Sequence, residues 1–448
     1  VPLSNGDMTT FASGIASDWM AFDTGATLPA AISFYPDVSS FRSAPCSQGI
    51  SGIGIALPYG SQFGVGVLRT LPAIPGAVYL LVGYQDFYDP TYMAPPARRY
   101  AHLFGIGTYG ETSPPQPFTM GGLMWMGAGQ WFFNDMPGNS TQVGGMHRCT
   151  AAWPARNGLI SIWTGLFTYA DAPASTGPTV FTTDDLSLFR FDNPVQPQLQ
   201  NAGFEIVEVL TPGLDPNDIS RITLPSAWIP VGGGVGQKES FYTDSYGKRT
   251  GSTGLRIYNH RGCFTRGVMQ RVAVASGAWQ ATFSVWVRSN KSGGTTARIG
   301  IDPAGGDDVR STGIVWGSYT RADETWQQVT VSAPCSAGPI TLFLCATNDA
   351  ASTGAVHYAD FDDASLTFEM DQSPPEPFSV LPDTPATLTT FLSGVVSPVP
   401  FDPESGISRV DYAIGSIPGG EDIRPFTPCS DPAVISAPNL ALTPGQTC

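Results

Sequence analysis

The stretch ATFSVWVRS at residues 281–289 has an apolar residue at every second position, with Phe283, Val285 and Val287 in phase. This alternation predicts a β-strand with one buried face, because successive side chains of a strand point to opposite faces of a sheet. Six more runs between residues 254 and 368 are similarly short, rich in β-branched or aromatic residues and bounded by turn-forming residues. They are GLRIYN, GVMQRVAV, TARIGID, WQQVTVSA, ITLFLCAT and VHYADFDDASLTF. Two sheets of such strands bury their apolar faces against each other, so the sequence predicts an all-β sandwich.

The first half of the chain repeats the second. The run GVLR at residues 66–69 corresponds to GVMQ at residues 267–270, and DDLSL at 184–188 corresponds to DDASL at 362–366. A repeat of this length is typical of two copies of one domain. The sequence therefore predicts two tandem sandwiches.

The repeat and two proline-containing joints divide the chain into three predicted domains. Residues 1–192 and 198–370 are the two sandwich copies, and the short joint between them is semi-rigid because of its prolines. A second joint at residues 371–377 precedes a strand-rich third region at 378–448. That region is short for a complete sandwich of about seven strands.

The composition excludes two classes of partner. The 448 residues include 22 Lys and Arg against 37 Asp and Glu, so the net charge is −15. Nucleic-acid binding needs a basic surface that neutralises phosphates, and docking on an anionic membrane surface needs basic residues too. The sequence also lacks a run of about 18 apolar residues, so no transmembrane helix and no membrane insertion are predicted.

Seven cysteines are scattered along the chain, and none forms a C-x-x-C pair, which disfavours a zinc ribbon or a thioredoxin-like site. Scattered cysteines together with few lysines and many Gly, Ser, Thr and Pro residues are typical of an extracellular, secreted or cell-surface protein. The odd number leaves one thiol unpaired or bound to another chain, and the connectivity stays open. The candidates for disulfides are Cys46 and Cys149 in the first copy, Cys263 and Cys345 beside Cys335 in the second, and Cys429 and Cys448 in the third region.

No pattern of reactive side chains predicts catalysis. The sequence has no G-x-S-x-G elbow, no Walker A loop and no histidines at metal-binding spacing. The acid pairs at 307–308 and 323–324 lie in turn-like segments, where Asp is favoured by turn geometry alone. The glycines at 232–234 predict a turn and not a phosphate loop, because no strand-to-helix unit follows them. The protein is therefore predicted not to be an enzyme.

Several motifs of the second copy together point to a known family. They are Asn201 with Phe204-Glu205, a mid-domain Trp228, the strand WQQVTV at 326–331 and the closing DDASL at 362–366. These residues resemble the jelly-roll carbohydrate-binding modules found beside bacterial cellulases and xylanases. The resemblance implies a jelly-roll sandwich that binds polysaccharide. The first copy fits less well, because Asp7-Met8 stands where Phe-Glu is expected.

The third region has the pattern DPESGI at 402–407, DYAIG at 411–415 and PGG at 418–420. This pattern resembles a fibronectin type III or immunoglobulin-like module of a bacterial surface protein. Such modules continue past a turn like Leu442–Thr447 into two more strands. The resemblance therefore implies an incomplete module here, whose last strands come from a longer chain or from another subunit.

Sugar binding needs flat rings that stack on the C–H faces of pyranoses, with polar neighbours. Trp228, Trp286 and Trp326 occupy repeat, signature or strand positions and are predicted to lie in the core. Aromatic residues in loop-like or inserted segments are the better candidates for a binding platform, although packing in a turn or contact with another subunit explains any single one as well. The candidates are Trp316, Tyr319, Tyr242 and Tyr246 in the second copy, and Trp125, Trp131 and Tyr88 in the first.

The resemblance also implies structural calcium, held by an acid near the start and an Asp near the end of each copy. It assigns Glu205, Asp360 and Asp363 in the second copy, and Asp7 and Asp184 in the first. The alternative is that the Asp pairs only end a turn and start a strand.

Two functions follow from these features. The first is a non-catalytic extracellular protein that binds polysaccharide or adheres at the cell surface. The second is a structural subunit of a filament or coat, whose third module is completed by a neighbouring copy of the same chain. The short third region, the spare cysteine and the apolar aromatics of residues 124–133 favour the second function.

Overall fold

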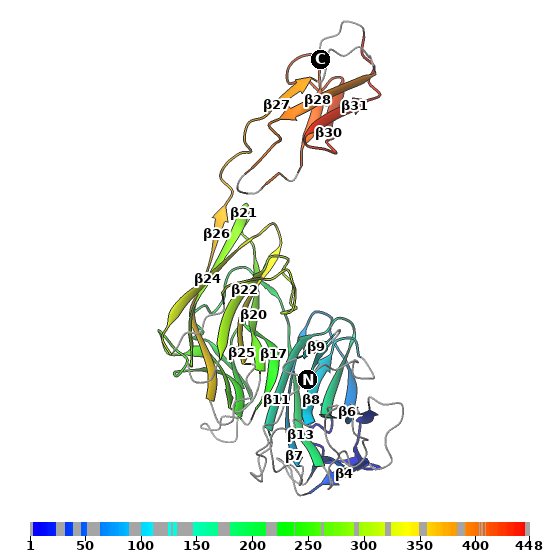
Figure 1. Ribbon diagram of the computed structural model, residues 1–448, viewed down its shortest axis with the longest axis vertical. Helices are drawn as coiled ribbons and strands as arrows, with labels where there is room; N and C mark the ends of the chain where they lie inside the picture. Colours follow the sequence, from blue (N-terminus) through cyan, green and yellow to red (C-terminus); the bar gives the residue numbers. More distant parts are fainter. Residues whose placement is uncertain are drawn as a thin grey trace. The chain divides into compact units, whose positions relative to one another are not determined.

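The structure is a computed structural model that divides into two compact units (Figure 1). Unit 1 comprises Val1–Ala275 and Ala281–Thr367, and unit 2 comprises Ser276–Gln280 and Phe368–Cys448. The residues that the structure describes are 3–23, 32–38, 46–51, 63–88, 100–110, 124–126, 129–131, 147–168, 180–211, 222–236, 238–260, 264–290, 295–318, 324–348, 356–382, 390–402, 404, 406–407 and 409–443.

Within these ranges the regular secondary structure consists of β-strands, so the predicted all-β fold class is confirmed. The same ranges hold no helix long and apolar enough to cross a membrane.

Three large sheets build unit 1. The six-stranded sheet has the order β3 (Met20–Asp23), β6 (Phe63–Pro72), β12 (Leu159–Thr168), β8 (Tyr100–Gly107), β10 (Gly129–Trp131) and β9 (Met124–Met126). The five-stranded sheet has the order β18 (Lys238–Asp244), β19 (Gly254–His260), β26 (Val356–Met370), β21 (Ala278–Ser289) and β24 (Gln327–Pro334).

The third sheet, here called the long sheet, has strands from both halves of the chain. Its order is β23 (Val315–Trp316), β22 (Thr296–Asp302), β25 (Pro339–Asn348), β20 (Phe264–Ala273), β17 (Ile229–Gly236), β11 (His147–Pro154), β7 (Val78–Tyr88), β13 (Val180–Phe191), β5 (Ser47–Ser51) and β4 (Ser33–Asp37), and β14 (Val195–Gln196) adds to β20 in parallel. Two small hairpin sheets complete unit 1: β1 (Phe11–Ala12) with β2 (Ile15–Ala16), and β15 (Val207–Thr211) with β16 (Ile222–Pro225).

The two halves of unit 1 have the same strand topology. Strands β3-β6-β12-β8-β10 in the first half follow the same order as β17-β20-β25-β22-β23 in the second, and β4-β5-β13-β7-β11 follow the same order as β18-β19-β26-β21-β24. The pairing register agrees as well, because Met20 pairs with Leu68 where Ile229 pairs with Met269. The sequence repeat therefore has a direct counterpart in the strand order.

The start of each half has the same local structure. Asn5 and Asn201 both adopt a left-handed backbone, with φ of 49° and 47°, which Asn tolerates better than most residues. Each amide side chain donates hydrogen bonds to two backbone carbonyls of the segment that follows. The indole Nε1 of Trp19 donates to the Asn5 carbonyl, and that of Trp228 donates to the Asn201 carbonyl. Trp228 is buried, as predicted.

The predicted turn at Gly232–Gly234 is wrong, because these glycines lie inside strand β17. They pair with β20 on one side and with β11 on the other, which joins the two halves into the long sheet (Figure 1). Gly232 has φ of 79°, and a Cβ there would collide with the backbone of Thr265. The backbone of β17 lies so close to that of β20 that only glycine fits at this position. Consecutive glycines are also typical of turns, so the sequence pattern was interpreted as a turn.

Unit 2 is a smaller β structure. One sheet has the order β27 (Ser379–Pro382), β28 (Phe391–Ser397) and β31 (Val434–Pro438), and the other pairs β29 (Asp411–Ile414) with β30 (Arg424–Pro428). A small buried cluster of Tyr412, Ala437 and Leu440 lies between them, and the Tyr412 hydroxyl donates to the Ser436 carbonyl.

Candidate functional site

The outward face of the five-stranded sheet carries a group of aromatic and charged side chains. Strand β21 shows how the sequence builds it, because its burial alternates strictly from Ala281 to Ser289. The apolar side chains Phe283, Val285 and Val287 are buried on one side. The side chains on the other side are partly exposed: Thr282, Ser284, Trp286 and Arg288.

A ladder of hydroxyl groups crosses from β21 to the edge strand β24. Thr282 and Ser332 are hydrogen-bonded through their side-chain oxygens at 2.8 Å, and so are Ser284 and Thr330. The ladder therefore makes this part of the face polar, with each hydroxyl able to make a further hydrogen bond.

Asp360 is the buried anion at the centre of the face. Its carboxylate has no solvent exposure and accepts from Arg256 Nε at 2.6 Å and Nη2 at 2.9 Å. It also accepts from Arg288 Nε at 2.9 Å and Nη2 at 2.6 Å. Such charge-assisted hydrogen bonds are short and strong, so one carboxylate holds two guanidinium groups in place.

The two arginines also position the backbone turn that follows β18. Nη2 of Arg256 and Nη2 of Arg288 donate to the Tyr246 carbonyl, at 3.2 Å and 2.8 Å. The Tyr246 side chain itself is 73% exposed. A large aromatic ring is thus presented to solvent on a backbone that the charged network positions.

Guanidinium groups lie over aromatic rings across the face, at distances typical of cation–π contacts. The pairs are Arg249 over Trp286 at 3.7 Å from the ring centroid, Arg256 over Tyr358 at 4.3 Å, Arg288 over Trp326 at 4.9 Å and Arg256 near Tyr246 at 5.9 Å. Each stacked guanidinium is fixed in a plane, with N–H groups at its edge.

The loop that carries Arg249 is tied to the middle of β26. Nη1 of Arg249 pairs with Asp363 Oδ2 at 2.7 Å, and the Thr250 hydroxyl donates to Asp363 Oδ1 at 2.6 Å. The backbone N–H groups of Arg249 and Thr250 donate to Asp362 Oδ2 at 2.6 Å and 3.0 Å. Burial raises the pKa of Asp362, and these backbone hydrogen bonds offset the increase only in part.

The electrostatics also affect the Tyr358 hydroxyl. Burial raises the pKa of Tyr358, and the charge of Asp360 raises it further, while Arg256 and Arg288 act in the opposite direction. The hydroxyl is therefore protonated at neutral pH and can donate a hydrogen bond.

The predicted aromatic candidates of the second copy divide between two sheets. Tyr246 lies on the face just described, and the backbone of Tyr242 on β18 pairs with Arg256 on β19. Trp316 lies instead on β23, at the end of the long sheet, with Arg298 over its ring at 3.7 Å and Phe343 beside it at 5.9 Å. The side chain of Tyr242 and the whole of Tyr319 lie outside the described residues.

The candidates of the first copy lie on three strands. Tyr88 ends β7, Trp125 is on β9 and Trp131 is on β10, but their side chains lie outside the described residues.

The core assignment of Trp286 and Trp326 is wrong, because both are partly exposed and lie beneath arginines of the outward face. The signal for Trp286 is in the sequence, where it is in phase with Ser284 and Arg288. The grouping of Arg256, Arg288 and Asp360 was missed, because no spacing along the chain brings three separate strands together.

In the second copy, the acids that the resemblance assigned to calcium accept hydrogen bonds from other groups of the protein. Glu205 accepts from the backbone N–H groups of Ser252 and Thr253 at 3.0–3.2 Å, whereas Asp360 and Asp363 pair with arginines. In the first copy, Asp184 is buried and Asp7 is exposed. Calcium at either set stays a prediction.

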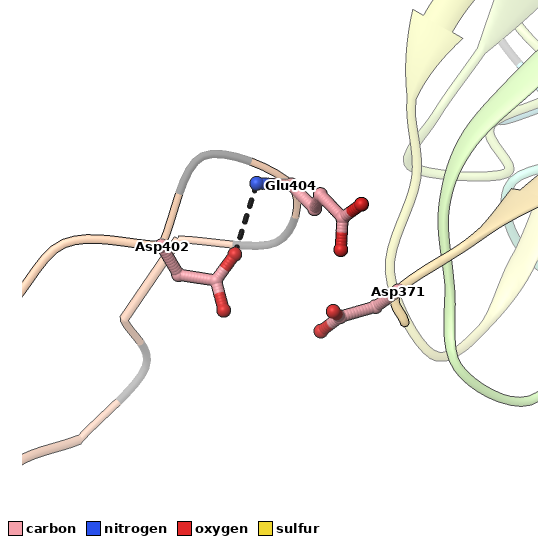
Figure 2. Close-up of side chains that lie close together, drawn as sticks. All are labelled: Asp371, Asp402 and Glu404. Carbon is pink, nitrogen blue, oxygen red and sulfur yellow. Dashed lines mark hydrogen bonds between the residues drawn. The ribbon is translucent and has the colours of Figure 1, made fainter. Parts of the chain in front are cut away.

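Unit 2 contains another group of acids, shown in Figure 2. Asp371, Asp402 and Glu404 each bring a carboxylate oxygen within 4.8 Å of the others, and Asp402 Oδ1 accepts from the Glu404 N–H at 2.9 Å. The backbone N–H groups of Ser373 and Gln372 lower the pKa of Glu404, which is therefore ionised at neutral pH. Carboxylate oxygens are ligands of hard cations, so this set has the donor chemistry for one.

The cysteines that the structure describes are free thiols: Cys46, Cys149, Cys335, Cys345 and Cys429. Cys46 donates to the Met8 carbonyl, and Cys149 donates to Gln85 Oε1. The predicted disulfide between Cys46 and Cys149 is therefore not formed in this structure. Cys263 and Cys448 lie outside the described residues.

No protein-family model and no curated protein matches this chain. Similar solved structures include the carbohydrate-binding module TmCBM61 in complex with β-1,4-galactotriose, at 16% identity over 39% of this chain and 99% of that one, with a TM-score of 0.24. The tandem CBM22-1–CBM22-2 domain of Paenibacillus barcinonensis Xyn10C is 11% identical over 80% and 95% of the two chains, with a TM-score of 0.25. A family 16 carbohydrate-binding module is 20% identical over 28% and 84%, with a TM-score of 0.21. Likeness at this level carries no functional argument.

Proposed function

We propose that the protein binds polysaccharide without catalysis, through the outward face of the five-stranded sheet, and that it acts outside the cell, secreted or at the cell surface. The observation that carries the proposal is the exposed Tyr246 ring beside two arginines that Asp360 holds in place. The proposed location follows from the cysteine and lysine content alone.

The chemistry of the face suits a saccharide. An exposed ring stacks on the C–H side of a sugar, while guanidinium N–H groups and the hydroxyl ladder hydrogen-bond to sugar hydroxyls. Because Asp360 already orders Arg256 and Arg288, binding needs little further loss of side-chain entropy.

The same contacts disfavour hydrolysis at this face. Glycoside hydrolysis needs two carboxyl groups with access to the bond between sugars. Both oxygens of Asp360 are occupied by guanidinium groups, and Asp363 pairs with Arg249 and Thr250. Binding is therefore the function that these residues support.

The test is affinity electrophoresis of the protein in gels that contain a panel of polysaccharides. The polysaccharide that slows the protein is then used for calorimetric titration. Tyr246→Ala should weaken binding roughly tenfold, since an aromatic contact contributes about 1.5 kcal/mol. Tyr109→Ala is the matched control, because Tyr109 is a 51% exposed tyrosine of the first half, away from the five-stranded sheet. Equal affinity of Tyr246→Ala and Tyr109→Ala, or no binding to any polysaccharide, contradicts the proposal.

A second candidate function, assembly of copies of this chain into an extracellular filament or coat, is favoured by the surface of unit 2. Among the described residues, eleven of the twenty exposed large hydrophobic side chains belong to residues 368–448. Leu381 and Val434 flank Val395 in register, so an exposed apolar row crosses the sheet β27-β28-β31. An apolar surface of this kind is typical of an interaction site.

Self-association is measured by light scattering over a range of protein concentrations. Assembly through this row predicts a mass that rises with concentration and a return to monomer in Val395→Lys. A monomer at all concentrations excludes this second function.

A further inference from the structure

The first half of unit 1 has a counterpart of the proposed saccharide face. Because the strand orders match, β7 and β11 in the first half correspond to β21 and β24 in the second. The outward side of β7 and β11 is therefore the place where a second, equivalent binding face is expected.

Contacts within the first half show which side of β7 and β11 faces outward. Gln85 Nε2 donates to the Thr164 hydroxyl on β12 at 2.7 Å, and Cys149 Sγ lies 3.4 Å from Gln85 Oε1, so Gln85 and Cys149 face the six-stranded sheet. The pairing of β7 with β11 runs without a register shift. Alternation along the strands then places Val82 and Thr150 on the opposite, outward side.

This outward side is apolar and buried in the first half. Leu80, Val82, Thr150 and Ala152 are all at most 3% exposed, although they point away from the six-stranded sheet. The corresponding positions of the second half form the exposed hydroxyl ladder between β21 and β24. Equivalent positions of the two halves are thus apolar and buried in the first half but polar and exposed in the second. This difference indicates that the surface is covered in the first half and open to solvent in the second.

Contacts across the joint identify what covers it. Residues 148–152 of β11 pair with residues 232–236 of β17, and β18 packs beside β11. Arg156 Nη1 lies 2.7 Å from Asp307 Oδ1.

A second contact comes from the same loop of the second half. Arg310 lies over the ring of Trp153, 4.4 Å from its centroid, and is itself paired with Asp308 at 2.8 Å. Asp307 and Arg310 of the second half thus contact the end of β11 and the turn after it, through a salt bridge to Arg156 and a cation–π contact to Trp153. Trp153 is in phase with Cys149 and faces the six-stranded sheet, so these contacts fix the second half beside β11, and the packing of β18 on β11 is the contact that bears on the outward side.

We propose that the first half has given up its binding face to become the docking surface of the second half. The two halves then form one body with a single saccharide face, on the five-stranded sheet. The number of ligand sites rests on the proposed function, whereas the docking does not.

Hydrogen exchange on the full wild-type chain tests the docking without any ligand. Strand β11 lies between two partners in the docked body, so the amides of residues 148–152 and 232–236 should exchange more than about 100-fold slower than unstructured amides. Exchange of either segment at the unstructured rate overturns the docking, whatever the protein binds.

Matched variants give a second readout. Val82→Asp puts a charge into the docking surface and should lower the melting temperature and speed exchange at residues 232–236 in the other half. Ser284→Asp puts the same charge on the exposed ladder and should leave both unchanged. Equal effects of the two variants overturn the docking, and if Val82→Asp does not fold, the wild-type exchange decides.

The number of sites is measured by calorimetric titration with an oligosaccharide from the polysaccharide that the panel selects. One site per chain, weakened in Ser284→Asp, supports the single face, and two equivalent sites overturn it. If no polysaccharide binds, the proposed function fails while the exchange result still decides the docking.

Discussion

Asp360→Asn removes one negative charge from the centre of the face and keeps the shape of the side chain. Two guanidinium groups then lose their common counter-ion, and an amide can accept only part of the four hydrogen bonds that Arg256 and Arg288 donate. The Tyr246 turn, which depends on both arginines, loses its positioning as well.

The structure sets the magnitude of this effect. Removing one partner of a buried ion pair costs about 3–5 kcal/mol. The arginine side chains keep 16% and 23% of their exposure, so the low end, about 3 kcal/mol, is expected here. For a body of the size of unit 1, that loss lowers the melting temperature by roughly 4 °C.

The assay is thermal unfolding of unit 1 followed by circular dichroism, with Asp363→Asn as the control. Asp363 is on the same strand and also pairs with an arginine, but that pair is partly exposed, and Asn tolerates its φ of 49°. The control should therefore cost at most about 1 kcal/mol. Equal losses in the two variants, or no loss at Asp360, would refute the role of Asp360 as the buried counter-ion.

Three further predictions concern titration, thiol reactivity and calcium. Burial acts to raise the pKa of Asp308, but hydrogen bonds and charge from Arg310 outweigh burial and lower that pKa. Asp308 therefore adds stability above about pH 4, and this stability is lost as the pH falls through the pKa of Asp308 in the folded protein. Asp308→Asn should flatten that part of a curve of stability against pH. Burial raises the pKa of the Cys345 thiol to about 12, so Ellman's reagent at pH 8 should modify Cys345 only after unfolding, and rapid modification of the native protein would contradict its burial. If Glu205 or Asp184 holds calcium, millimolar Ca²⁺ should raise the melting temperature and a chelator should lower it, and an unchanged value in both would remove calcium from the account.

The sequence predicted the parts of the fold that have local signals. The alternation of Phe283, Val285 and Val287 predicted both the strand and its buried side, because side-chain direction in a strand depends only on position. The repeat predicted that the two halves share a design, and their strand orders do match.

The joint between the halves has no local signal. Strands β11 and β17, which pair at the joint, are far apart in the chain. The glycines at residues 232–234 predicted a turn, but Gly232 is there because a larger side chain would collide with the neighbouring strand. Composition alone cannot distinguish these two reasons for glycine. The prediction that Trp286 lies in the core rested on its position in an alternating strand, although its phase along β21 places it on the outward side. The network around Asp360 depends on residues of three strands and one turn, which only the folded chain brings together.

The crystal structure of the full chain with a fragment of the selected polysaccharide tests the central claim most directly. Density for a sugar stacked on Tyr246 and hydrogen-bonded to Arg288, once per chain, is the predicted result. A sugar bound at Trp316, on the six-stranded sheet or on unit 2, with the Tyr246 face empty, would contradict the account.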